Sequence, residues 1–312
     1  ENRAMTDILL VAVNARHSHC SFAGRSLLAN LEEMAERAAL LERDLDVTPL
    51  ELAEAIVARR PRIAGFSVYL WNKRLVGDTA LLLRRLLPGA SIVLGGPEIV
   101  PGCAGEWQGL ADVLVHGEGE DVFREWCRRR LRPPAAPPAR DDGGEPQWLA
   151  APPGGVKPET LALPYERYDA VDIARRTLYV ESSRGCPFRC LYCSSRRGGL
   201  RLLPLPRLLP ALEKLMTRGA RRFKFLDRSF NADEAHACAL LDFFLARISP
   251  ELRLHLEIVP LALGRELRAR LAAFPRGTLH LETGVQTLDE EVARRLGRPE
   301  KRAAVLATLD FL

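Results

Sequence analysis

Short apolar runs alternate with longer stretches of helical periodicity in the first half of the chain. The apolar runs, each predicted to be a strand, cover residues 8–13, 63–69, 91–94 and 113–115. The periodic stretches, each predicted to be a helix, cover residues 22–43, 75–87 and 120–131. Strands that are apolar throughout are typical of a sheet whose two faces are both covered by helices. We therefore predict a doubly wound, Rossmann-like α/β domain over residues 1–131.

A proline-rich stretch interrupts this alternation. Nine prolines fall between Arg132 and Pro164. Proline breaks a helix interior and cannot donate to the ladder of a central strand. We therefore interpret residues 132–176 as a linker.

The alternation of strands and helices then resumes. Strands are predicted over residues 177–182, 222–226, 253–258 and 278–283, and helices over 208–218, 235–248, 266–273 and from 289 onward. Four βα units over residues 177–312 predict an incomplete (β/α) barrel. The chain starts four residues before Met5 and stops inside an apolar helical pattern, so we expect it to be truncated at both ends.

Composition and charge narrow the class of protein. The chain is 47% hydrophobic and 27% charged, which is typical of a globular protein. It lacks an apolar run near the roughly 18 residues of a membrane span and an evident signal peptide, so we expect a cytoplasmic protein that does not enter a membrane. The net charge is +5, but the basic runs are not interleaved with aromatic residues, and nucleic-acid binding is therefore not expected.

Three of the seven cysteines lie close together, directly after a predicted strand. Cys186, Cys190 and Cys193 have Cys-x3-Cys-x2-Cys spacing. Three thiolates can bind three irons of a [4Fe–4S] cluster and leave the fourth iron open, whereas a structural cluster takes four cysteines. A structural zinc site would need a fourth Cys or His at ordinary spacing, and none lies between Ser194 and Ala235. We predict that these three cysteines hold an iron–sulfur cluster.

This loop resembles the signature of the radical S-adenosylmethionine (SAM) superfamily. Further stretches resemble a largely uncharacterised family that joins an N-terminal cobalamin-binding domain to a radical SAM domain. They are residues 11–19 (VAVNARHSH), 65–72 (GFSVYLWN), 94–98 (LGGPE), 116–120 (HGEGE), 181–186 (ESSRGC), 224–231 (KFLDRSFN) and 282–286 (ETGVQ). The resemblance implies three cofactors: a [4Fe–4S] cluster, SAM and cobalamin.

Polar residues at the ends of the later strands are candidates for binding SAM, because the chemistry of a parallel barrel sits at the carboxyl ends of its strands. The resemblance implies that Tyr192 packs near the adenine, that Asp227 with Ser229 holds the amino group, and that Glu257 holds the ribose. Two further candidates are Glu282 and Gln286. The alternative is that these are ordinary polar residues at strand ends.

A doubly wound sheet binds its ligand outside the carboxyl ends of its strands. The candidate cobalamin-binding residues there are Asn14, His17, His19, Ser67, Gly95 and Gly96. The two glycines allow close approach of the backbone to a bulky ligand. Methyltransferase-type cobalamin domains carry Asp-x-His-x-x-Gly after the first strand, with the His on cobalt. Neither histidine here fits that pattern, so no cobalt–His bond is expected.

A rival for the first domain is the methylthiotransferase architecture, in which three N-terminal cysteines hold a second cluster. Cys20, Cys103 and Cys127 are available for it. Cys127 and Cys238 lie in predicted helices, so we interpret both as small core residues.

The expected function is that of a radical SAM enzyme that cleaves SAM reductively and uses cobalamin to methylate an unactivated carbon. Its electron would come from an external one-electron donor such as flavodoxin or ferredoxin. Two alternatives stay open: a cobalamin-assisted rearrangement or ring formation, and a non-catalytic iron–sulfur or corrinoid-binding sensor. The substrate cannot be predicted from the sequence.

Overall fold

The computed structural model describes residues 6–132, 144–193, 199–260, 263–298 and 300–312. The chain divides into two compact units. The first unit comprises Glu1–Val156 and Leu161–Arg167, and the second comprises Lys157–Thr160 and Tyr168–Leu312. Residues 132–176, which were expected to form a linker, are thus shared between the two units.

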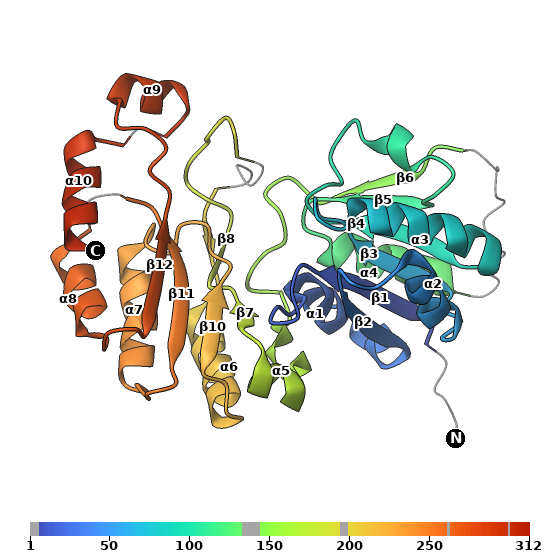
Figure 1. Cartoon of the computed structure of the whole chain (residues 1–312), viewed down its shortest axis with the longest axis horizontal. Helices are drawn as coiled ribbons and strands as arrows, with labels where there is room; N and C mark the ends of the chain where they lie inside the picture. The colour runs from blue at the N-terminus through green and yellow to red at the C-terminus, as the bar shows by residue number, and fades with distance from the viewer. Residues whose placement is uncertain (1–5, 133–143, 194–198, 261–262, 299) are drawn as a thin grey trace. The chain divides into compact units, whose positions relative to one another are not determined.

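A parallel sheet forms the centre of the first unit (Figure 1). Within the described residues it has six strands, in the order β2-β1-β3-β4-β5-β6. The strands are β1 (Ile8–Asn14), β2 (Ala38–Asp44), β3 (Ile63–Ser67), β4 (Ser91–Gly95), β5 (Val113–His116) and β6 (Gln147–Ala150). The helices are α1 (Phe22–Ala29), η1 (Glu32–Arg37), α2 (Pro49–Val57), α3 (Lys73–Leu86), η2 (Ala104–Trp107), α4 (Glu120–Leu131) and η3 (Pro164–Arg167).

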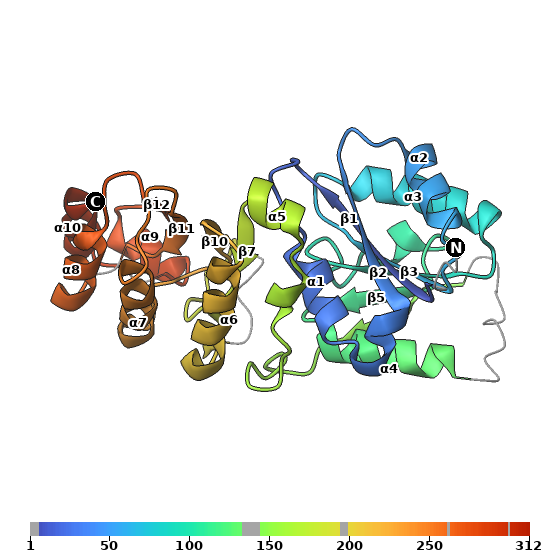
Figure 2. The same cartoon turned by 90° about the horizontal axis from the view of Figure 1, so that it is seen from below.

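Side chains of β1 point alternately to the two faces of this sheet, and each face is covered by helices (Figure 2). Leu9 and Val11 pack in one apolar cluster with residues of α2 and α3. Ile8 and Leu10 pack in a second cluster with residues of α1 and α4. The period of two is that of an extended strand, and the two cores confirm the doubly wound α/β prediction.

The helix expected over residues 22–43 is wrong in its second half. α1 ends at Ala29, and after the short η1 the chain forms strand β2. All seven residues of β2 pair in parallel register with β1, from Ile8 opposite Ala38 to Asn14 opposite Asp44. Alanine, leucine, glutamate and arginine are good helix formers, so tertiary pairing overrides local propensity here.

Two further elements of this unit were not expected. α2 begins with proline at its first turn, and Thr48 caps it through a reciprocal capping box with Glu51, an arrangement that satisfies orphan N–H groups at a helix start. β6 comes from the proline-rich stretch and pairs in parallel with β5 at the edge of the sheet. An edge position is where a proline-rich segment can still supply a strand.

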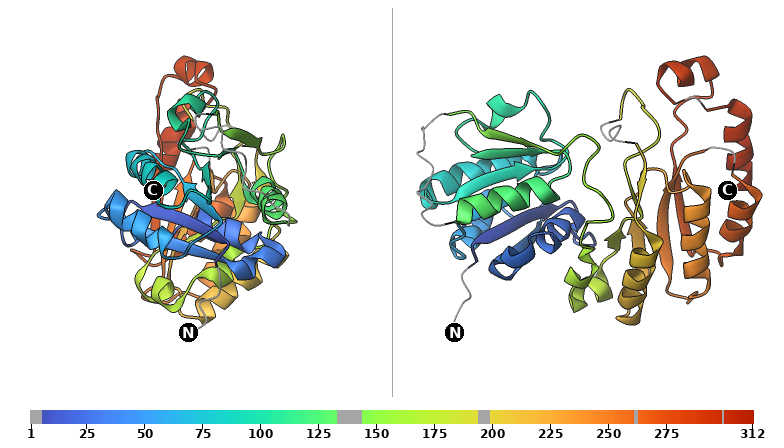
Figure 3. Two further views of the ribbon diagram at one scale, coloured as in Figure 1. Left: turned by 90° about the vertical axis from the view of Figure 1, so that its right-hand side faces the viewer. Right: turned by 180° about the vertical axis from the view of Figure 1, so that it is seen from behind.

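The second unit contains a smaller parallel sheet, with four strands among the described residues, in the order β12-β11-β10-β7 (Figure 1, Figure 3). The strands are β7 (Leu178–Val180), β10 (Arg222–Phe225), β11 (Arg253–Ile258) and β12 (Leu279–Thr283), with a short antiparallel ribbon of β8 (Ser183–Arg184) and β9 (Arg201–Leu202). The helices are α5 (Ala170–Arg175), α6 (Leu205–Thr217), α7 (Glu234–Leu245), α8 (Arg265–Ala273), α9 (Glu290–Arg295) and α10 (Arg302–Phe311). The predicted succession of four strands with following helices is confirmed.

The two faces of the second sheet differ in chemistry. Phe223 and Phe225 are buried and contact Phe244 of α7. Lys224, between these two phenylalanines, points to the opposite face of the sheet. Together with the residues aligned with it on the neighbouring strands, it forms a polar row on that face: Tyr179, Lys224, His255 and His280. A period of two therefore separates an apolar, helix-covered face from a polar face.

Within the described ranges, no helix combines the length and apolar character needed to cross a membrane.

Candidate functional site

The three cysteines lie on one loop, residues 186–193, which we call the cysteine loop. It follows β7 and β8, at the carboxyl edge of the second sheet. Cys190 is buried, whereas Cys186 and Cys193 are partly exposed. The N–H of Cys193 donates to the carbonyl of Cys190 at 3.1 Å, so the last two cysteines share a tight turn.

The described part of the chain contains no group of three His, Cys, Asp or Glu side chains arranged to hold a single metal ion. A single ion needs all its ligands around one point. In a [4Fe–4S] cluster each thiolate binds a different iron, so the same finding does not test the cluster. The donor set fits such a cluster in its chemistry: three thiols on one loop, two of them accessible.

Asp227, expected to bind the SAM amino group, follows β10 and is almost completely buried. Its Oδ2 accepts a hydrogen bond from the N–H of Ser182 at 2.9 Å, and its Oδ1 accepts bonds from the hydroxyls of Ser182 and Ser183, each at 2.6 Å. Burial raises the pKa of Asp227, while the bonds from the two serines lower it. The carboxylate therefore orders the residues that lead into the cysteine loop.

Two further buried polar residues lie close to Asp227 in the chain or interact with it. Ser229 was expected to help bind the SAM amino group, and His236 was not singled out from the sequence. Ser229 is buried, and its hydroxyl has no hydrogen-bond partner among the described residues. His236 of α7 is also buried, and burial lowers its pKa while the charge of Asp227 raises it. A network of this kind depends on tertiary contacts: Asp227 and Ser229 were singled out from the sequence, but His236 was not.

Glu257 and Glu282 lie opposite each other on β11 and β12, on the polar face of the sheet. Glu257 is 3.5 Å from the guanidinium of Arg228. Glu282 Oε2 lies 2.9 Å from His255 Nε2 and 3.7 Å from Lys224 Nζ. The structure thus places Glu257 beside Arg228 and Glu282 beside His255 and Lys224, and the contact of both glutamates with SAM stays a prediction.

The same contacts shift the pKa values on this face. The hydrogen bond from His255 and the charge of Lys224 hold the pKa of Glu282 below its usual value. Burial lowers the pKa of His255, although Glu282 opposes the shift. The rings of His255 and His280 meet edge to face at 4.4 Å. An imidazole beside a carboxylate can accept or pass on a proton.

Two other predicted SAM residues are at the surface. Tyr192 is about half exposed on the cysteine loop. Gln286 is exposed beyond the end of β12.

The predicted cobalamin-binding residues lie where the chain turns to opposite sides of the first sheet. β1 pairs with β2 on one side and with β3 on the other, and such a switch point is where doubly wound sheets bind ligands. Asn72 connects the carboxyl ends of β1 and β3, because its Nδ2 donates to the carbonyls of Val13 at 3.2 Å and Ser67 at 3.0 Å.

Asn14 is held by a largely buried glutamate, Glu42, that was not singled out from the sequence. Glu42 of β2 accepts hydrogen bonds from Asn14 Nδ2 at 3.1 Å, from the N–H of Ser21 at 2.6 Å and from Arg25 at 2.6 Å. Burial raises the pKa of Glu42, but the bond and charge of Arg25 and the bonds from Ser21 and Asn14 together lower it below its usual value. Asn14 also donates to the carbonyl of His19. Asn14 is therefore a buried support of the loop after β1.

His17 lies exposed on that loop. Its Nδ1 is 3.0 Å from Asp44 Oδ2, at the carboxyl end of β2. The structure places it at the ligand edge of the sheet, and its role toward cobalamin stays a prediction.

The glycine pair is held close to the end of β3. The N–H of Val68 donates to the carbonyl of Gly95 at 2.7 Å. Gly96 has a φ of +108°, and a Cβ there would lie 2.6 Å from the carbonyl oxygen of Val68. Glycine is thus required at 96 both by its φ and by the space available.

Exposed apolar side chains border the same edge. Leu70 and Trp71 are 79% and 49% exposed. The ring of Trp71 stacks on Tyr69 at 4.4 Å, and its Nε1 donates to the carbonyl of Val13. Exposed apolar and aromatic side chains at the carboxyl edge of a doubly wound sheet can pack against the face of a large ring system, so the residues present fit cobalamin.

A second cluster on Cys20, Cys103 and Cys127 is not supported. Cys103 packs in the apolar cluster of α2 and α3, and Cys127 packs in that of α1 and α4, on the other face of the sheet. Burial also raises the pKa of Cys127, which opposes formation of the thiolate that binds metals.

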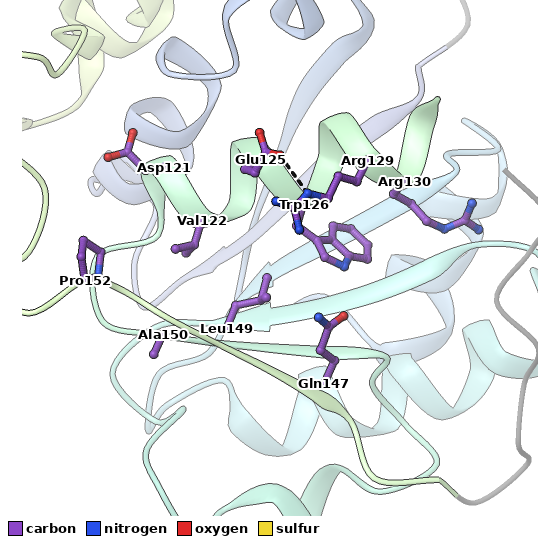
Figure 4. A pocket seen from close by; sticks show the side chains of 10 residues that line it. All are labelled: Asp121, Val122, Glu125, Trp126, Arg129, Arg130, Gln147, Leu149, Ala150 and Pro152. Atoms are coloured by element: carbon purple, nitrogen blue, oxygen red, sulfur yellow. Dashed lines mark hydrogen bonds and ion pairs between the residues drawn. The ribbon is translucent and has the colours of Figure 1, made fainter. Parts of the chain in front are cut away.

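The first unit also has a groove between α4 and the edge strand β6 (Figure 4). Val122, Trp126 and Leu149 form its apolar lining, and Glu125 and Arg129 pair along one side. None of the predicted cobalamin-binding residues lines it.

Comparison with known families assigns both halves of the chain. The B12 binding domain model matches residues 9–126. The Radical SAM superfamily model matches residues 180–312. The first match reaches from β1 to β5 and into α4, and the second begins at the last residue of β7 and includes β10, β11 and β12.

Individual relatives agree with these matches. Over 224 residues, 62% of its length, the chain is 31% identical to the 2-(S-pantetheinyl)-carbapenam-3-carboxylate methyltransferase of Streptantibioticus cattleyicolor. Over 223 residues, 61% of its length, it is 29% identical to the cobalamin-dependent radical SAM methyltransferase TokK of Streptomyces tokunonensis. The chain spans 31% of the length of each of these two relatives.

A solved structure supports the fold. The radical S-adenosylmethionine methyltransferase TsrM from Kitasatospora setae, with cobalamin and a [4Fe–4S] cluster bound, is 20% identical in sequence, with a TM-score of 0.68. The match covers 97% of this chain and 66% of TsrM.

Proposed function

Because the chain belongs to the radical SAM proteins that carry a B12-binding domain, we propose that it cleaves SAM reductively and methylates an unactivated carbon. One observation carries the proposal. Three thiols share one loop at the carboxyl edge of a parallel sheet, in a chain whose other unit is a B12-binding domain. The relatives named as methyltransferases favour methylation over rearrangement.

In this proposal Cys186, Cys190 and Cys193 hold the [4Fe–4S] cluster. When bound, the cluster supplies the electron that breaks a carbon–sulfur bond of SAM and so yields a radical able to abstract hydrogen. Asp227 acts one step away, because it fixes Ser182 and Ser183 ahead of the loop. Tyr192 would pack near the adenine.

In the first unit, the loops after β1, β3 and β4 would hold cobalamin. Ser67, Gly95 and Gly96 line the edge, and Trp71 offers an apolar face. When bound, cobalamin supplies the methyl group. The loop after β1 lacks the Asp-x-His-x-x-Gly pattern, so we propose that no histidine of this loop binds cobalt.

An external one-electron donor such as flavodoxin or ferredoxin and a cytoplasmic location belong to the same proposal. All seven cysteines are free thiols, which agrees with a reducing compartment.

Anaerobic reconstitution with iron and sulfide, followed by addition of SAM, hydroxocobalamin and dithionite, tests the function. We expect the broad absorption of a [4Fe–4S] cluster, a change in the corrin bands, and release of 5′-deoxyadenosine. Cys190→Ala should abolish cleavage of SAM. Cys238→Ala is the matched control, because Cys238 is a buried cysteine of α7 outside the loop.

The products separate the alternatives. S-adenosylhomocysteine together with 5′-deoxyadenosine supports methylation, because one SAM reloads the methyl group and the other yields the radical. 5′-Deoxyadenosine alone, in the presence of a substrate that is consumed, indicates rearrangement. A protein that binds its cofactors but never cleaves SAM is a sensor, and the enzyme proposal fails.

A further inference from the structure

The middle of the cysteine loop rests on a turn that follows α9, far later in the chain. The N–H of Leu191 donates to the carbonyl of Leu296 at 3.0 Å, and the N–H of Arg189 donates to the carbonyl of Gly297 at 3.4 Å. These two bonds flank Cys190, the buried cysteine of the loop. The backbone on both sides of Cys190 is therefore held by one short segment.

Gly297 permits this approach. Its φ is +74°, and a Cβ at this position would lie 2.6 Å from the carbonyl oxygen of Arg189 and 3.6 Å from the N atom of Cys190. A residue with a side chain would meet both an unfavourable backbone conformation and a backbone clash. The contact between loop and turn therefore depends on glycine.

Arg298 contacts side chains of the cysteine loop. The guanidinium interacts electrostatically with the Tyr192 hydroxyl and lies 5.9 Å from the centre of the Phe188 ring. Tyr192 also interacts with Cys190, because the two side chains influence each other electrostatically. A planar guanidinium with five donors can serve several partners in fixed directions.

Glu300 fixes the guanidinium in turn. Its Oε1 lies 2.5 Å from Arg298 Nε, and the two side chains are only 3% and 12% exposed. An ion pair buried to this degree holds its geometry, because breaking it leaves an uncompensated charge. The contacts run from Glu300 through Arg298 and Tyr192 to Cys190.

We propose that Leu296, Gly297, Arg298 and Glu300 form a loop seat that places Cys190 in position before the cluster assembles. These are positioning residues: they act through Cys190 and Tyr192. The inference rests on the proposed function, because it takes Cys190 to be a cluster ligand. A ligand held in place by surrounding contacts loses less conformational freedom when it binds, so the loop seat raises the affinity of the site for its cluster.

Gly297→Ala tests the backbone contact, and Gly277→Ala is its matched control. Gly277 has a similar φ of +85°, but a Cβ there would meet nothing within 4 Å. Both variants carry the same backbone strain, and only Gly297→Ala displaces the loop. After anaerobic reconstitution we expect Gly297→Ala to bind iron and sulfide about tenfold more weakly than the wild type, the size typical of lost supporting contacts at a metal site. Gly277→Ala should bind as the wild type does.

Arg298→Gln tests the side-chain contact in case Gly297→Ala does not fold, as judged by circular dichroism. We expect weaker iron binding and an altered electron paramagnetic resonance spectrum of the reduced cluster. Arg298→Lys keeps the positive charge but lacks the planar guanidinium with its several donors, so it should restore only part of the iron binding that Arg298→Gln loses. Arg295→Gln is the control, because Arg295 lies exposed on α9 and pairs with Glu291.

The outcomes distinguish this inference from the proposed function. If the wild type assembles a cluster and both Gly297→Ala and Arg298→Gln assemble it equally well, the loop seat is refuted. If the wild type assembles no cluster, the proposed function fails first.

Discussion

Asp227 and Ser182 are joined twice: the backbone N–H of Ser182 bonds to one carboxylate oxygen at 2.9 Å and its hydroxyl bonds to the other at 2.6 Å. The pair links the end of β10 to the residues just after β7, immediately before the cysteine loop. These two hydrogen bonds to Ser182, together with almost complete burial, give Asp227 a structural role at the position expected to contact SAM.

Asp227→Ala should therefore lower the free energy of unfolding by about 3 kcal/mol, because buried donors of Ser182 and Ser183 would lose their acceptor. Chemical denaturation of the full chain measures this. Asp310→Ala, on the exposed side of α10, should have almost no effect. A variant that is as stable as the wild type but needs far more SAM would show that the carboxylate faces the substrate instead.

The buried carboxyl also predicts a pH dependence. Because burial raises the pKa of Asp227, the folded carboxyl keeps its proton to a higher pH than the unfolded one. The stability that it contributes is present below the ordinary aspartate pKa and is lost as the pH rises through the raised folded value. We expect Asp227→Asn to remove this part of the pH dependence. Unfolding curves of both proteins across the acidic range would reveal an identical slope if the idea is wrong.

The polar face of the second sheet gives a prediction for His255. Glu282→Gln should lower the pKa of His255 further, because the Glu282 hydrogen bond and charge raise it. Lys224→Met should raise the pKa, because the nearby ammonium disfavours protonation. Nuclear magnetic resonance titration of the imidazole measures both shifts. A His255 titration unchanged by Glu282→Gln would contradict the pair.

The loop after β1 gives a prediction for Glu42. Glu42→Ala should cost about 3–5 kcal/mol of stability, because it leaves the buried guanidinium of Arg25 without its carboxylate. It should also weaken binding of hydroxocobalamin, measured from the corrin absorption, because Asn14 and Ser21 lose their anchor. Asp44→Ala, which removes only the exposed pair with His17, should cost at most about 1 kcal/mol. Equal losses in the two variants would contradict the role assigned to Glu42.

The glycine pair after β4 gives a matched comparison. Gly96 and Gly102 have similar φ values of +108° and +97°, but only at Gly96 would a Cβ meet backbone, 2.6 Å from the Val68 oxygen. Gly102→Ala should cost about 1–2 kcal/mol from strain alone. Gly96→Ala should cost more and should also impair hydroxocobalamin binding, because the ends of β3 and β4 must separate. If both variants bind hydroxocobalamin like the wild type, Gly96 does not shape the ligand edge.

Local pattern determined much of this protein. The continuous apolar run of β1 and the resumed succession of strand and helix segments after the proline-rich stretch were sufficient to predict strands, because burial leaves a direct record in the residue types. The spacing of Cys186, Cys190 and Cys193 was equally sufficient to predict a metal-binding loop, because ligands on one short loop are close in space wherever the loop lies.

Tertiary contacts decided the rest. The residues of β2 favour a helix by propensity, and they form a strand because each pairs with a residue of β1. In the sequence, nothing distinguishes Glu42 from the many other charged residues. Its role follows from the strand pairing, which places it beside Asn14 and Arg25. The support of Cys190 by Gly297 and Arg298 joins segments that are remote in the chain. Such contacts depend on how distant elements pack, and a local pattern of residue types carries no record of that packing.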